Sequence, residues 1–279
     1  MGMSRRDAEQ ETVLVGTDLS ARSDRAIDRA LLLSKEFGAR LMVLHAIEPY
    51  SLLKRDQTRA DKAIRDVLPD PEADVDVLPA IGPAPAALVA AAENGNCALV
   101  VMGVARMNHL GDYFIGTAVD HVIRSAPCPV LVVKRRPHRA YRTIAVAVDC
   151  SPCSQAALLT AARMFPAASI HVIHAFHVPY EGWLRSDDTR DDFTGVARAE
   201  LKAMLAAPEV PEDVRARTQL HLEYGEVHKV LLEATDRLGV DLVVMGTHGR
   251  GGFIRSMVGS RAEELLRCLP GDTMLVRQT

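Results

Sequence analysis

The internal repeat is the feature that most constrains the fold, because the first and second halves of this 279-residue chain have similar sequences. Residues 12–49 align with residues 143–179, and the similarity continues to the end of each half. The matching residues are Asp18 and Asp149, Ser20 and Ser151, His45 and His174, ALVVMG at 98–103 and DLVVMG at 241–246, and Gly116-Thr117 and Gly259-Ser260. A repeat of half a chain is a duplicated domain, since solenoid modules span roughly 20 to 50 residues. We therefore predict two similar domains, residues 1–137 and 138–279, that meet in the short basic segment 134–142.

Short apolar runs alternate with segments of helical periodicity in both halves. The runs lie at 12–17, 40–46, 73–79, 98–102 and 129–134, and again at 142–148, 169–175, 216–222, 241–245 and 272–277. This alternation predicts an α/β fold in which each half is an open five-stranded parallel sheet with helices on both faces. The pattern alone allows the strand orders 2-1-3-4-5 and 3-2-1-4-5, and ligands of such sheets bind beyond the carboxyl ends of the strands.

Composition argues against several classes of protein. The net charge is -3 and aromatic residues make up 4% of the chain, whereas nucleic-acid binding usually needs a basic excess and stacking platforms. No apolar run reaches the ~20 residues that span a bilayer, so we expect a cytoplasmic protein without a membrane partner. Five irregularly spaced cysteines indicate reduced thiols rather than a disulfide framework.

A glycine-rich stretch follows the fourth apolar run of the second half, in VVMGTHGRGGFIRSMVGSRAEELL at 243–266. Glycine at 246 and 249 lets the backbone turn tightly and approach a ligand. Gly259-Ser260 opens a predicted helix, with Ser260 as its expected N-cap, and free N–H groups at a helix start suit phosphate. Three arginines, Arg250, Arg255 and Arg261, surround the stretch and favour a polyanion. The alternative is a surface loop whose arginines are merely solvated.

Asp149 ends the first strand of the second half and would face this loop if the order is 3-2-1-4-5. A carboxylate there can accept hydrogen bonds from ribose hydroxyls or from an adenine amino group. His248 lies in the loop, but no carboxylate is visibly placed to orient it as a base. We therefore expect no catalytic residues, and whether the chain is an enzyme stays open.

The pattern G-x2-G-x9-G-[S/T], formed by Gly246, Gly249, Gly259 and Ser260, resembles the nucleotide-binding motif of the universal stress protein family. The resemblance covers essentially the whole chain as two tandem domains. It implies the 3-2-1-4-5 sheet, and ATP, with or without Mg²⁺, bound by domains with an intact motif. The candidate nucleotide-binding residues are Asp149, Ser151, Ala175, Met245, Gly246, Gly249, Arg250, Gly259, Ser260 and Arg261.

The first half carries a weaker copy of this motif. Its candidate site residues are Asp18, Ala46, Gly103, Gly116 and Thr117. Arg106 replaces the second glycine, which puts a β-carbon where the backbone should approach phosphate, and Asp112 adds a negative charge. We expect this half to bind nucleotide poorly, or to serve in packing or partner contacts.

Two further patterns have ordinary structural interpretations. Cys150-Ser-Pro-Cys153 has the spacing of a redox pair or half a metal site, but no second pair completes a zinc site. We predict that Ser151 caps a helix and Pro152 is its first residue, so no metal is expected. His45 and His174 end the second strands at the same repeat position, which indicates a packing role.

These observations predict a cytoplasmic regulator or sensor that binds ATP chiefly in its second half. The alternatives are a slow ATP hydrolase or phosphotransferase using Asp149 and His248, and an interaction module with vestigial loops. The expected partners are an adenine nucleotide and an unidentified protein, with no nucleic acid. The last strands, 129–134 and 272–277, should pair the two halves as an intramolecular pseudo-dimer, and two chains could then form a homodimer.

Overall fold

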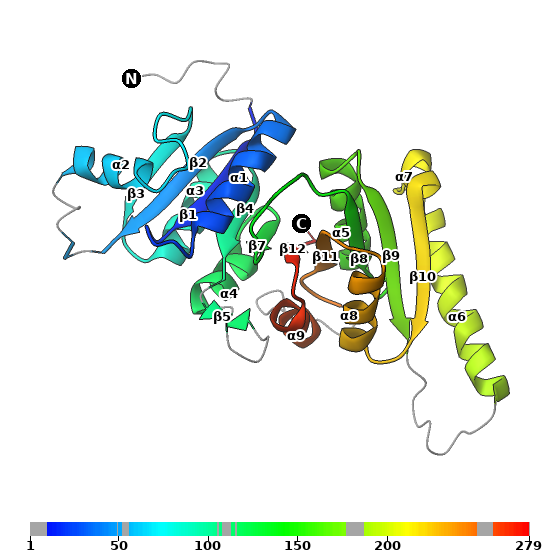
Figure 1. Ribbon diagram of the computed structural model, residues 1–279. Helices are drawn as coiled ribbons and strands as arrows, with labels where there is room; N and C mark the ends of the chain where they lie inside the picture. Colours follow the sequence, from blue (N-terminus) through cyan, green and yellow to red (C-terminus); the bar gives the residue numbers. More distant parts are fainter. Residues whose placement is uncertain are drawn as a thin grey trace.

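Ten strands form one continuous sheet through both halves of the chain (Figure 1). The computed structural model describes residues 10–48, 50–51, 56–104, 106–107, 113–114, 116–176, 187–249 and 259–278. The strands of the sheet are β1 (Thr12–Thr17), β2 (Arg40–Ile47), β3 (Asp76–Ile81), β4 (Cys97–Gly103), β7 (Val130–Val133), β8 (Thr143–Ala147), β9 (Ser169–Phe176), β10 (Thr218–Tyr224), β11 (Leu242–Gly246) and β12 (Asp272–Val276). Their order is β10-β9-β8-β11-β12-β7-β4-β1-β2-β3, so each half has the predicted order 3-2-1-4-5.

The two halves join edge to edge through their last strands. Neighbouring strands within each half are parallel, whereas β7 and β12 pair antiparallel with Leu131 opposite Met274. The predicted pairing of the halves is therefore present within one chain. It turns two edge strands into the centre of the sheet and leaves β3 and β10 as its outer edges.

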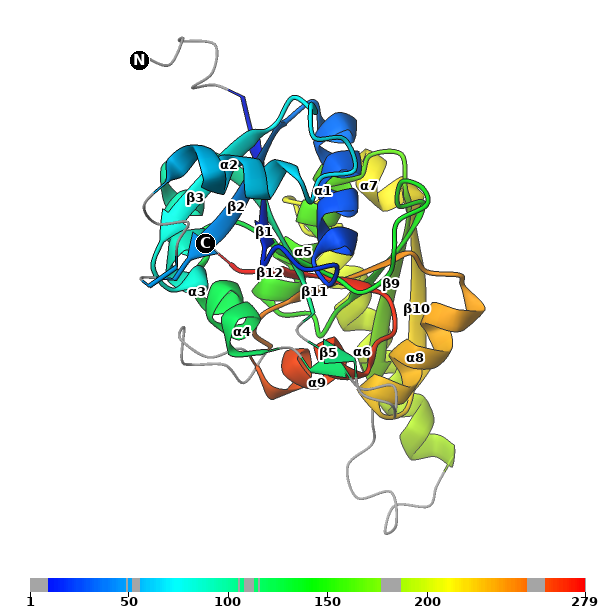
Figure 2. The ribbon, with the colours of Figure 1, turned by 60° about the vertical axis from the view of Figure 1, so that its left-hand side comes forward.

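The central strands read as continuous apolar runs because helices cover both faces of the sheet. All four residues of β7 are buried, as are all five of β12. The helices are α1 (Asp24–Phe37), α2 (Gln57–Arg65), α3 (Ala84–Asn94), α4 (Gly116–Ser125), α5 (Pro152–Met164), α6 (Asp187–Ala206), α7 (Glu212–Arg217), α8 (Val227–Arg237) and α9 (Ser260–Cys268). One apolar cluster holds side chains of α1, α2, α5 and α6, and the other holds those of α3, α4, α8 and α9. Figure 2 shows this second group in a row along one side.

The start of α5 confirms the structural interpretation of the two-cysteine motif. Ser151 is the N-cap, its Oγ accepts a hydrogen bond from the backbone N–H of Ser154 at 3.2 Å, and Pro152 is the first helical residue. Neither Cys150 nor Cys153 forms a disulfide. Cys150 has a positive φ of 59°, as does its counterpart Leu19, so the turn after the first strand has the same backbone shape in both halves.

Other boundaries differ in detail from the sequence prediction. The third strand of the first half begins at Asp76 rather than at residue 73, because residues 70–73 form a turn. A small hairpin of β5 (Arg106–Met107) and β6 (Tyr113–Phe114) was not predicted, since two-residue strands leave no periodic signal. Strand β6 of the hairpin lies next to α9 of the second half. Within the described ranges, every helix is too short or too polar to traverse a bilayer.

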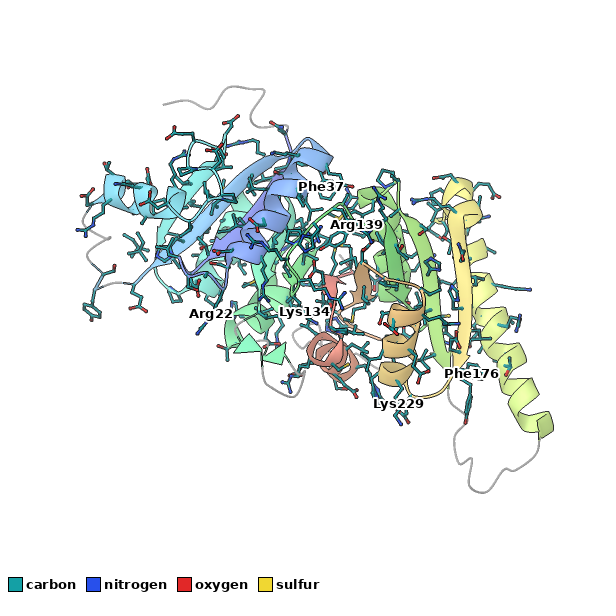
Figure 3. The ribbon with its side chains drawn as sticks, viewed as in Figure 1. Arg22, Phe37, Lys134, Arg139, Phe176 and Lys229 are labelled. Carbon is teal, nitrogen blue, oxygen red and sulfur yellow. The ribbon has the colours of Figure 1, made fainter. Side chains whose placement is uncertain are left out.

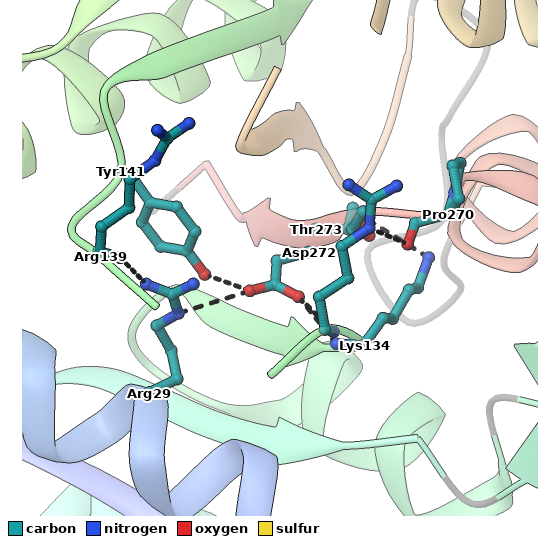
Figure 4. A network of polar contacts seen from close by, with 9 residues as sticks. Arg29, Lys134, Arg139, Tyr141, Pro270, Asp272 and Thr273 are labelled. Atoms are coloured by element: carbon teal, nitrogen blue, oxygen red, sulfur yellow. Dashed lines mark hydrogen bonds and ion pairs between the residues drawn. The ribbon is translucent and has the colours of Figure 1, made fainter. Parts of the chain in front are cut away.

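A buried polar network fastens the two halves on one face of the sheet (Figure 4). Asp272, at the start of β12, accepts hydrogen bonds from the backbone N–H groups of Lys134 and Arg135 and, at 2.6 Å, from the Tyr141 hydroxyl. Arg29 of α1 reaches the same carboxylate from the other half, with Nε 3.5 Å from Oδ2, and stacks over the Tyr141 ring at 4.0 Å. Burial raises the pKa of Tyr141 well above its usual value, and the carboxylate adds to the effect.

Candidate functional site

A cavity of about 480 Å³ opens at the carboxyl ends of the second-half strands. β8 and β11 are direct neighbours in the sheet, so Asp149 after β8 and Gly246 at the end of β11 reach the same edge. Gly249 and the start of α9 complete the rim, and Asp149 and Ser260 both line the cavity. The strand order thus brings together the carboxylate and the glycine-rich loop that the sequence separates by about a hundred positions.

Gly249 lies directly against the carboxylate of Asp149. A β-carbon on Gly249 would come 2.5 Å from Asp149 Oδ2, a distance that side chains do not tolerate. The other carboxylate oxygen of Asp149 accepts a hydrogen bond from the backbone N–H of Ser151 at 3.0 Å. A side chain at 249 would therefore displace the Asp149 carboxylate, whereas glycine lets the loop lie directly against it.

Contacts within the protein also favour glycine at positions 246 and 259. A β-carbon on Gly246 would come 2.8 Å from Cys153 Sγ and 3.0 Å from the Cys153 carbonyl carbon. One on Gly259 would come 3.3 Å from the carbonyl oxygen of Thr247, to which the Gly259 N–H donates at 2.8 Å. This last hydrogen bond ties the two described ends of the loop together, so α9 begins next to the end of β11.

The N-cap of α9 is Gly259, and Ser260 is its first helical residue, so the prediction of Ser260 as N-cap is wrong. A serine cap needs its own hydroxyl to accept a hydrogen bond from the first turn, and Gly259 leaves that first turn without a side-chain cap. The first N–H groups of an α-helix have no intrahelical acceptor. Because Gly259, Ser260, Arg261 and Ala262 line the cavity, the positive end of α9 faces it.

Half of the residues that line the cavity are apolar. They come from the ends of three strands and from two helices: Ala147, Val148, Ile173, Ala175, Val227, Leu231, Met245, Ala262 and Leu265. An apolar end next to a carboxylate and a helix start is the arrangement that a ligand with a flat apolar ring and an anionic tail would match. Sequence reasoning missed the contributions of α8 and of Leu265, although the helical spacing of 227–237 was visible.

Arg261, which lines the cavity, is already paired with a carboxylate of its own helix. Arg261 is exposed, and its Nη1 lies 3.3 Å from Glu264 Oε2. His228 Nδ1 lies 3.4 Å from the other oxygen of Glu264. Arg267 and Glu263 form a further ion pair one turn along α9. Arg250 and Arg255, two of the arginines that the sequence places around the loop, lie outside the described residues.

His248 lines the cavity, and its ring is held by its neighbour. Thr247 is buried, and its hydroxyl lies 2.9 Å from His248 Nδ1. His248 Nε2 is buried without a hydrogen-bond partner among the described residues. No group of three or more metal-ligating side chains occurs in the part of the chain that the structure describes.

The first half has an equivalent but smaller cavity, of about 200 Å³. Four of the five predicted site residues line it, Asp18, Ala46, Gly103 and Gly116, whereas Thr117 does not. The loop segment that contains Asp112 lies outside the described residues, and only the backbone of Arg106 is described, in β5. The cavity is bounded on one side by Arg22, which falls on the repeat position of Cys153.

Asp18 is bound within its own turn. Its Oδ1 accepts hydrogen bonds from the Ser20 N–H at 3.0 Å, the Ser20 hydroxyl at 2.7 Å and the Ser23 hydroxyl at 3.0 Å. Burial raises the pKa of Asp18, but these hydrogen bonds outweigh it and hold the pKa below its usual value. In the second half Ser154 stands at the position of Ser23, and its hydroxyl donates to the Ser151 carbonyl instead.

The histidines at the ends of the second strands have a shared structural role. His45 Nδ1 lies 3.0 Å from the Thr17 carbonyl oxygen, and His174 Nδ1 lies 2.8 Å from that of Val148. Each imidazole therefore ties the end of the second strand of its half to the end of the first strand, just before the site aspartate. The predicted packing role is consistent with these contacts.

Comparison with known sequences identifies the family. The sequence model of the universal stress protein family matches this chain twice, over residues 10–134 and 140–277. The chain belongs to the universal stress protein family. A universal stress protein from Mycolicibacterium smegmatis is 25% identical over 97% of this chain and 98% of its own length. A universal stress protein from Thermus aquaticus is 32% identical over 44% of this chain and 98% of its own length.

Solved structures show the same fold over the whole chain. A universal stress protein from Archaeoglobus fulgidus covers 97% of this chain and 100% of its own, with a TM-score of 0.66 at 18% identity. A putative universal stress protein from Pseudomonas aeruginosa covers 98% of this chain and 95% of its own, with a TM-score of 0.68 at 19% identity. The two-domain arrangement of this universal stress protein therefore recurs in other chains.

Within this universal stress protein, most predicted second-half site residues line one cavity. Asp149, Ala175, Met245, Gly246, Gly249, Gly259, Ser260 and Arg261 all do so. Ser151 does not line it, because its side chain caps α5 and is buried. Ser154, one turn further along α5, lines the cavity instead, a residue that sequence reasoning missed although it repeats Ser23 of the first half.

Proposed function

We propose that this universal stress protein binds an adenine nucleotide, ATP in the first instance, in the second-half cavity and acts as a regulator or sensor. The observation that carries the proposal is a single cavity of about 480 Å³ that combines an apolar end, the Asp149 carboxylate and the N-terminus of α9. Ligand sites are usually concave and mostly apolar with a few converging polar groups, which this cavity matches. The resemblance of the loop to the family motif points to the same ligand.

The parts of a nucleotide correspond to the parts of the cavity. The apolar side chains on β9, β11 and α8 suit the two faces of an adenine ring. Asp149 is placed to accept hydrogen bonds from ribose hydroxyls, and the free N–H groups at the start of α9 suit the phosphates. Arg261 would exchange Glu264 for a phosphate oxygen, which adds a charge-assisted hydrogen bond to the bound state.

Magnesium would enter this site together with the nucleotide. The described residues contain no cluster of three metal-ligating side chains, and Mg²⁺ commonly binds through substrate phosphates and water with few protein ligands. We therefore propose ATP with or without Mg²⁺ as the ligand and expect the protein groups to contact the nucleotide rather than the metal.

A regulator fits the site better than a hydrolase. A general base needs a group that orients it and receives charge, and among the described residues the neighbour of His248 Nδ1 is the Thr247 hydroxyl rather than a carboxylate. Release of ADP from ATP, lost in Asp149→Ala and His248→Ala, would support the hydrolase instead. Binding without turnover is the outcome that the regulator requires.

The internal pairing of the halves also bears on partners. Because β7 and β12 pair with each other, the last strands are not exposed for pairing with a second chain. A homodimer would have to use another surface, such as the outer strands β3 and β10. We propose a cytoplasmic setting, which five cysteines without a disulfide favour. We also propose domain limits of 1–137 and 138–279, and an unidentified protein that recognises the nucleotide-bound state.

Isothermal titration of ATP into the full chain tests the proposal. Gly249→Val should strongly weaken binding, because its side chain would displace the Asp149 carboxylate. The matched control is Gly271→Val, since a β-carbon on Gly271 meets open space outside the cavity. No heat of binding in the wild type, and no adenine nucleotide in the purified protein, would end the proposal. Equal binding by all three proteins would remove the loop from it.

A further inference from the structure

The residue that follows the last strand of each half donates hydrogen bonds to a helix end of the other half. Lys134 follows β7, and its Nζ lies 2.7 Å from the carbonyl oxygens of both Leu266 and Leu269, at the C-terminal end of α9. Arg277 follows β12, and its Nη1 lies 2.6 Å from the Arg124 carbonyl oxygen and 3.4 Å from that of Ala126, at the C-terminal end of α4. The two cations occupy the same repeat position, and so do the two helices.

The antiparallel pairing of β7 and β12 explains why these contacts cross between the halves. It brings the end of β7 beside the start of β12, where the Lys134 backbone N–H donates to Asp272 at 2.8 Å. The start of β12 is also where the chain leaves α9. The last carbonyl groups of an α-helix have no intrahelical donor, so a buried helix end needs one from elsewhere. Lys134 supplies it, with its side chain buried between the halves (Figures 3 and 4).

The charge state of Lys134 does not decide whether this contact forms. Burial lowers the pKa of Lys134 to about 7 and Arg135 adds to the effect, while Cys268 and Asp272 oppose it. An ammonium group has three N–H donors and a neutral amine still has two, which is enough for two carbonyl oxygens. The third neighbour, the Thr273 hydroxyl, lies 3.5 Å from Nζ.

Helix α9 therefore runs from the candidate site to the junction between the halves. Its first residues, Gly259 to Ala262, line the second-half cavity, and its last carbonyls are held by Lys134 of the first half. Nine helical residues span about 13 Å and form a short rod that moves as a unit. The β5–β6 hairpin of the first half packs against the same helix, beside it in both ribbon views (Figures 1 and 2).

We infer that Lys134 and Arg277 are reciprocal caps across the domain junction, and that Lys134 is a positioning residue for the second-half nucleotide site. This inference rests on the proposed function, because it assigns to α9 the binding of phosphate at its first turn. By fixing the far end of α9, the first half sets where the N–H groups of Gly259 to Arg261 stand. Binding at the cavity and order at the junction are then thermodynamically coupled, and the coupling is reciprocal.

The test compares full-length wild type, Lys134→Met and Arg277→Met by isothermal titration with Mg-ATP. Lys134→Met keeps the length of the side chain but removes its donors, so its affinity should fall about five- to tenfold, the range of ordinary coupling between sites. Arg277→Met removes the equivalent cap from α4 and should leave the affinity of the second-half site unchanged. Lys134→Arg places at 134 the residue that the other half uses and should recover most of the affinity.

Hydrogen exchange separates positioning from general loss of stability. In Lys134→Met without nucleotide, the amides of α9 should exchange faster while those of α5 keep their wild-type rates. Wild-type affinity in Lys134→Met, or equal losses in both Met variants, would overturn the inference and leave the proposed function in place. If the wild type does not bind Mg-ATP, both the proposed function and the coupling are refuted. If the amides of α9 exchange at the wild-type rate in Lys134→Met, then Lys134 does not cap α9.

Discussion

The two halves share a fold and a strand order but differ in the site that the fold presents. The second-half cavity is about 480 Å³ and the first-half cavity about 200 Å³. Glycine 249 closes onto Asp149, whereas the second motif glycine of the first half is replaced by Arg106. Asp18 takes three hydrogen bonds from serines of its own turn. The two halves therefore share a scaffold, and in the second half the motif glycine lies directly against the site aspartate.

The comparison also shows what the halves hold in common. The junction carries one polar network, and each half supplies part of it: Arg29 of the first half and Asp272 of the second. The pair of caps, Lys134 and Arg277, is symmetric in the same way. A first half with a reduced site thus still has a function to perform, because it completes the packing of α9.

The largest expected effect comes from breaking the shared junction. Asp272→Asn keeps the shape of the side chain but leaves the buried Arg29 guanidinium without its countercharge. Removing one partner of a buried ion pair typically costs about 3 to 5 kcal/mol, so we expect a decrease of that order in the free energy of unfolding, measured in urea. Both halves should lose stability together. Asp241→Asn is the control, because the Arg139 partner of Asp241 is exposed and the loss should stay below about 1 kcal/mol.

A second prediction contrasts equivalent glycines in the two halves. Gly246→Ala should decrease the free energy of unfolding by about 1 to 3 kcal/mol, because an added methyl group overpacks a filled site. That methyl group would come 2.8 Å from Cys153 Sγ, whereas in Gly103→Ala the nearest atom is the Arg22 carbonyl oxygen at 3.4 Å. Gly103→Ala should therefore be within about 0.5 kcal/mol of wild type in the same urea titration. Equal losses in the two variants would show that the halves are packed alike at this position.

A third prediction separates the two aspartates by ligand binding. Asp149→Asn keeps the acceptor for the Ser151 N–H but removes the charge, so ATP affinity should fall about tenfold or more, the value of a hydrogen bond to a charged group. Asp18→Asn should leave the affinity unchanged, since that carboxylate belongs to the smaller cavity. Titration calorimetry on both variants decides the point. A loss in Asp18→Asn alone would move the nucleotide to the first half.

The sequence predicted the scaffold well because the scaffold depends on local pattern. Continuous apolar runs marked the buried parallel strands, and the repeat marked the two halves. The meeting of Asp149 with Gly249 followed from strand order, which the family resemblance supplied. The sequence analysis explained the motif glycines by the approach of a ligand, but a side chain at 246 would clash with Cys153 and one at 249 would displace the Asp149 carboxylate. These contacts join different elements, so no spacing along the chain reveals them.

The features that the sequence analysis missed depend on contacts between separate elements of the fold. The roles of Lys134 and Arg277 depend on the antiparallel register of β7 and β12, which places each strand end beside a helix end of the other half. Ser260 was predicted as a cap from the motif, but the cap of α9 is Gly259, whereas the predicted cap of α5, Ser151, is confirmed. Shared sequence position indicated shared backbone shape, as at Leu19 and Cys150, rather than shared contact with a ligand.

The smallest expected effect is a difference in pH dependence between the aspartates of the two halves. Because Asp18 has a lowered pKa in the folded state, it binds a proton less readily there than in the unfolded chain. Its contribution to stability is therefore present above the unfolded pKa of 3.8 and is lost as the pH falls through the lower folded value. Asp18→Asn should remove this contribution at neutral pH, with a difference from wild type that shrinks in acid. The carboxylate is exposed and water screens it, so the difference should be below about 1 kcal/mol.

Urea titrations of wild type, Asp18→Asn and Ser23→Ala at a series of pH values measure this difference. Ser23→Ala should show part of the effect, because it removes one of the three hydrogen bonds to Asp18. A difference between Asp18→Asn and wild type that grows in acid would reverse the sign and show that Asp18 is not held as an anion by its serines.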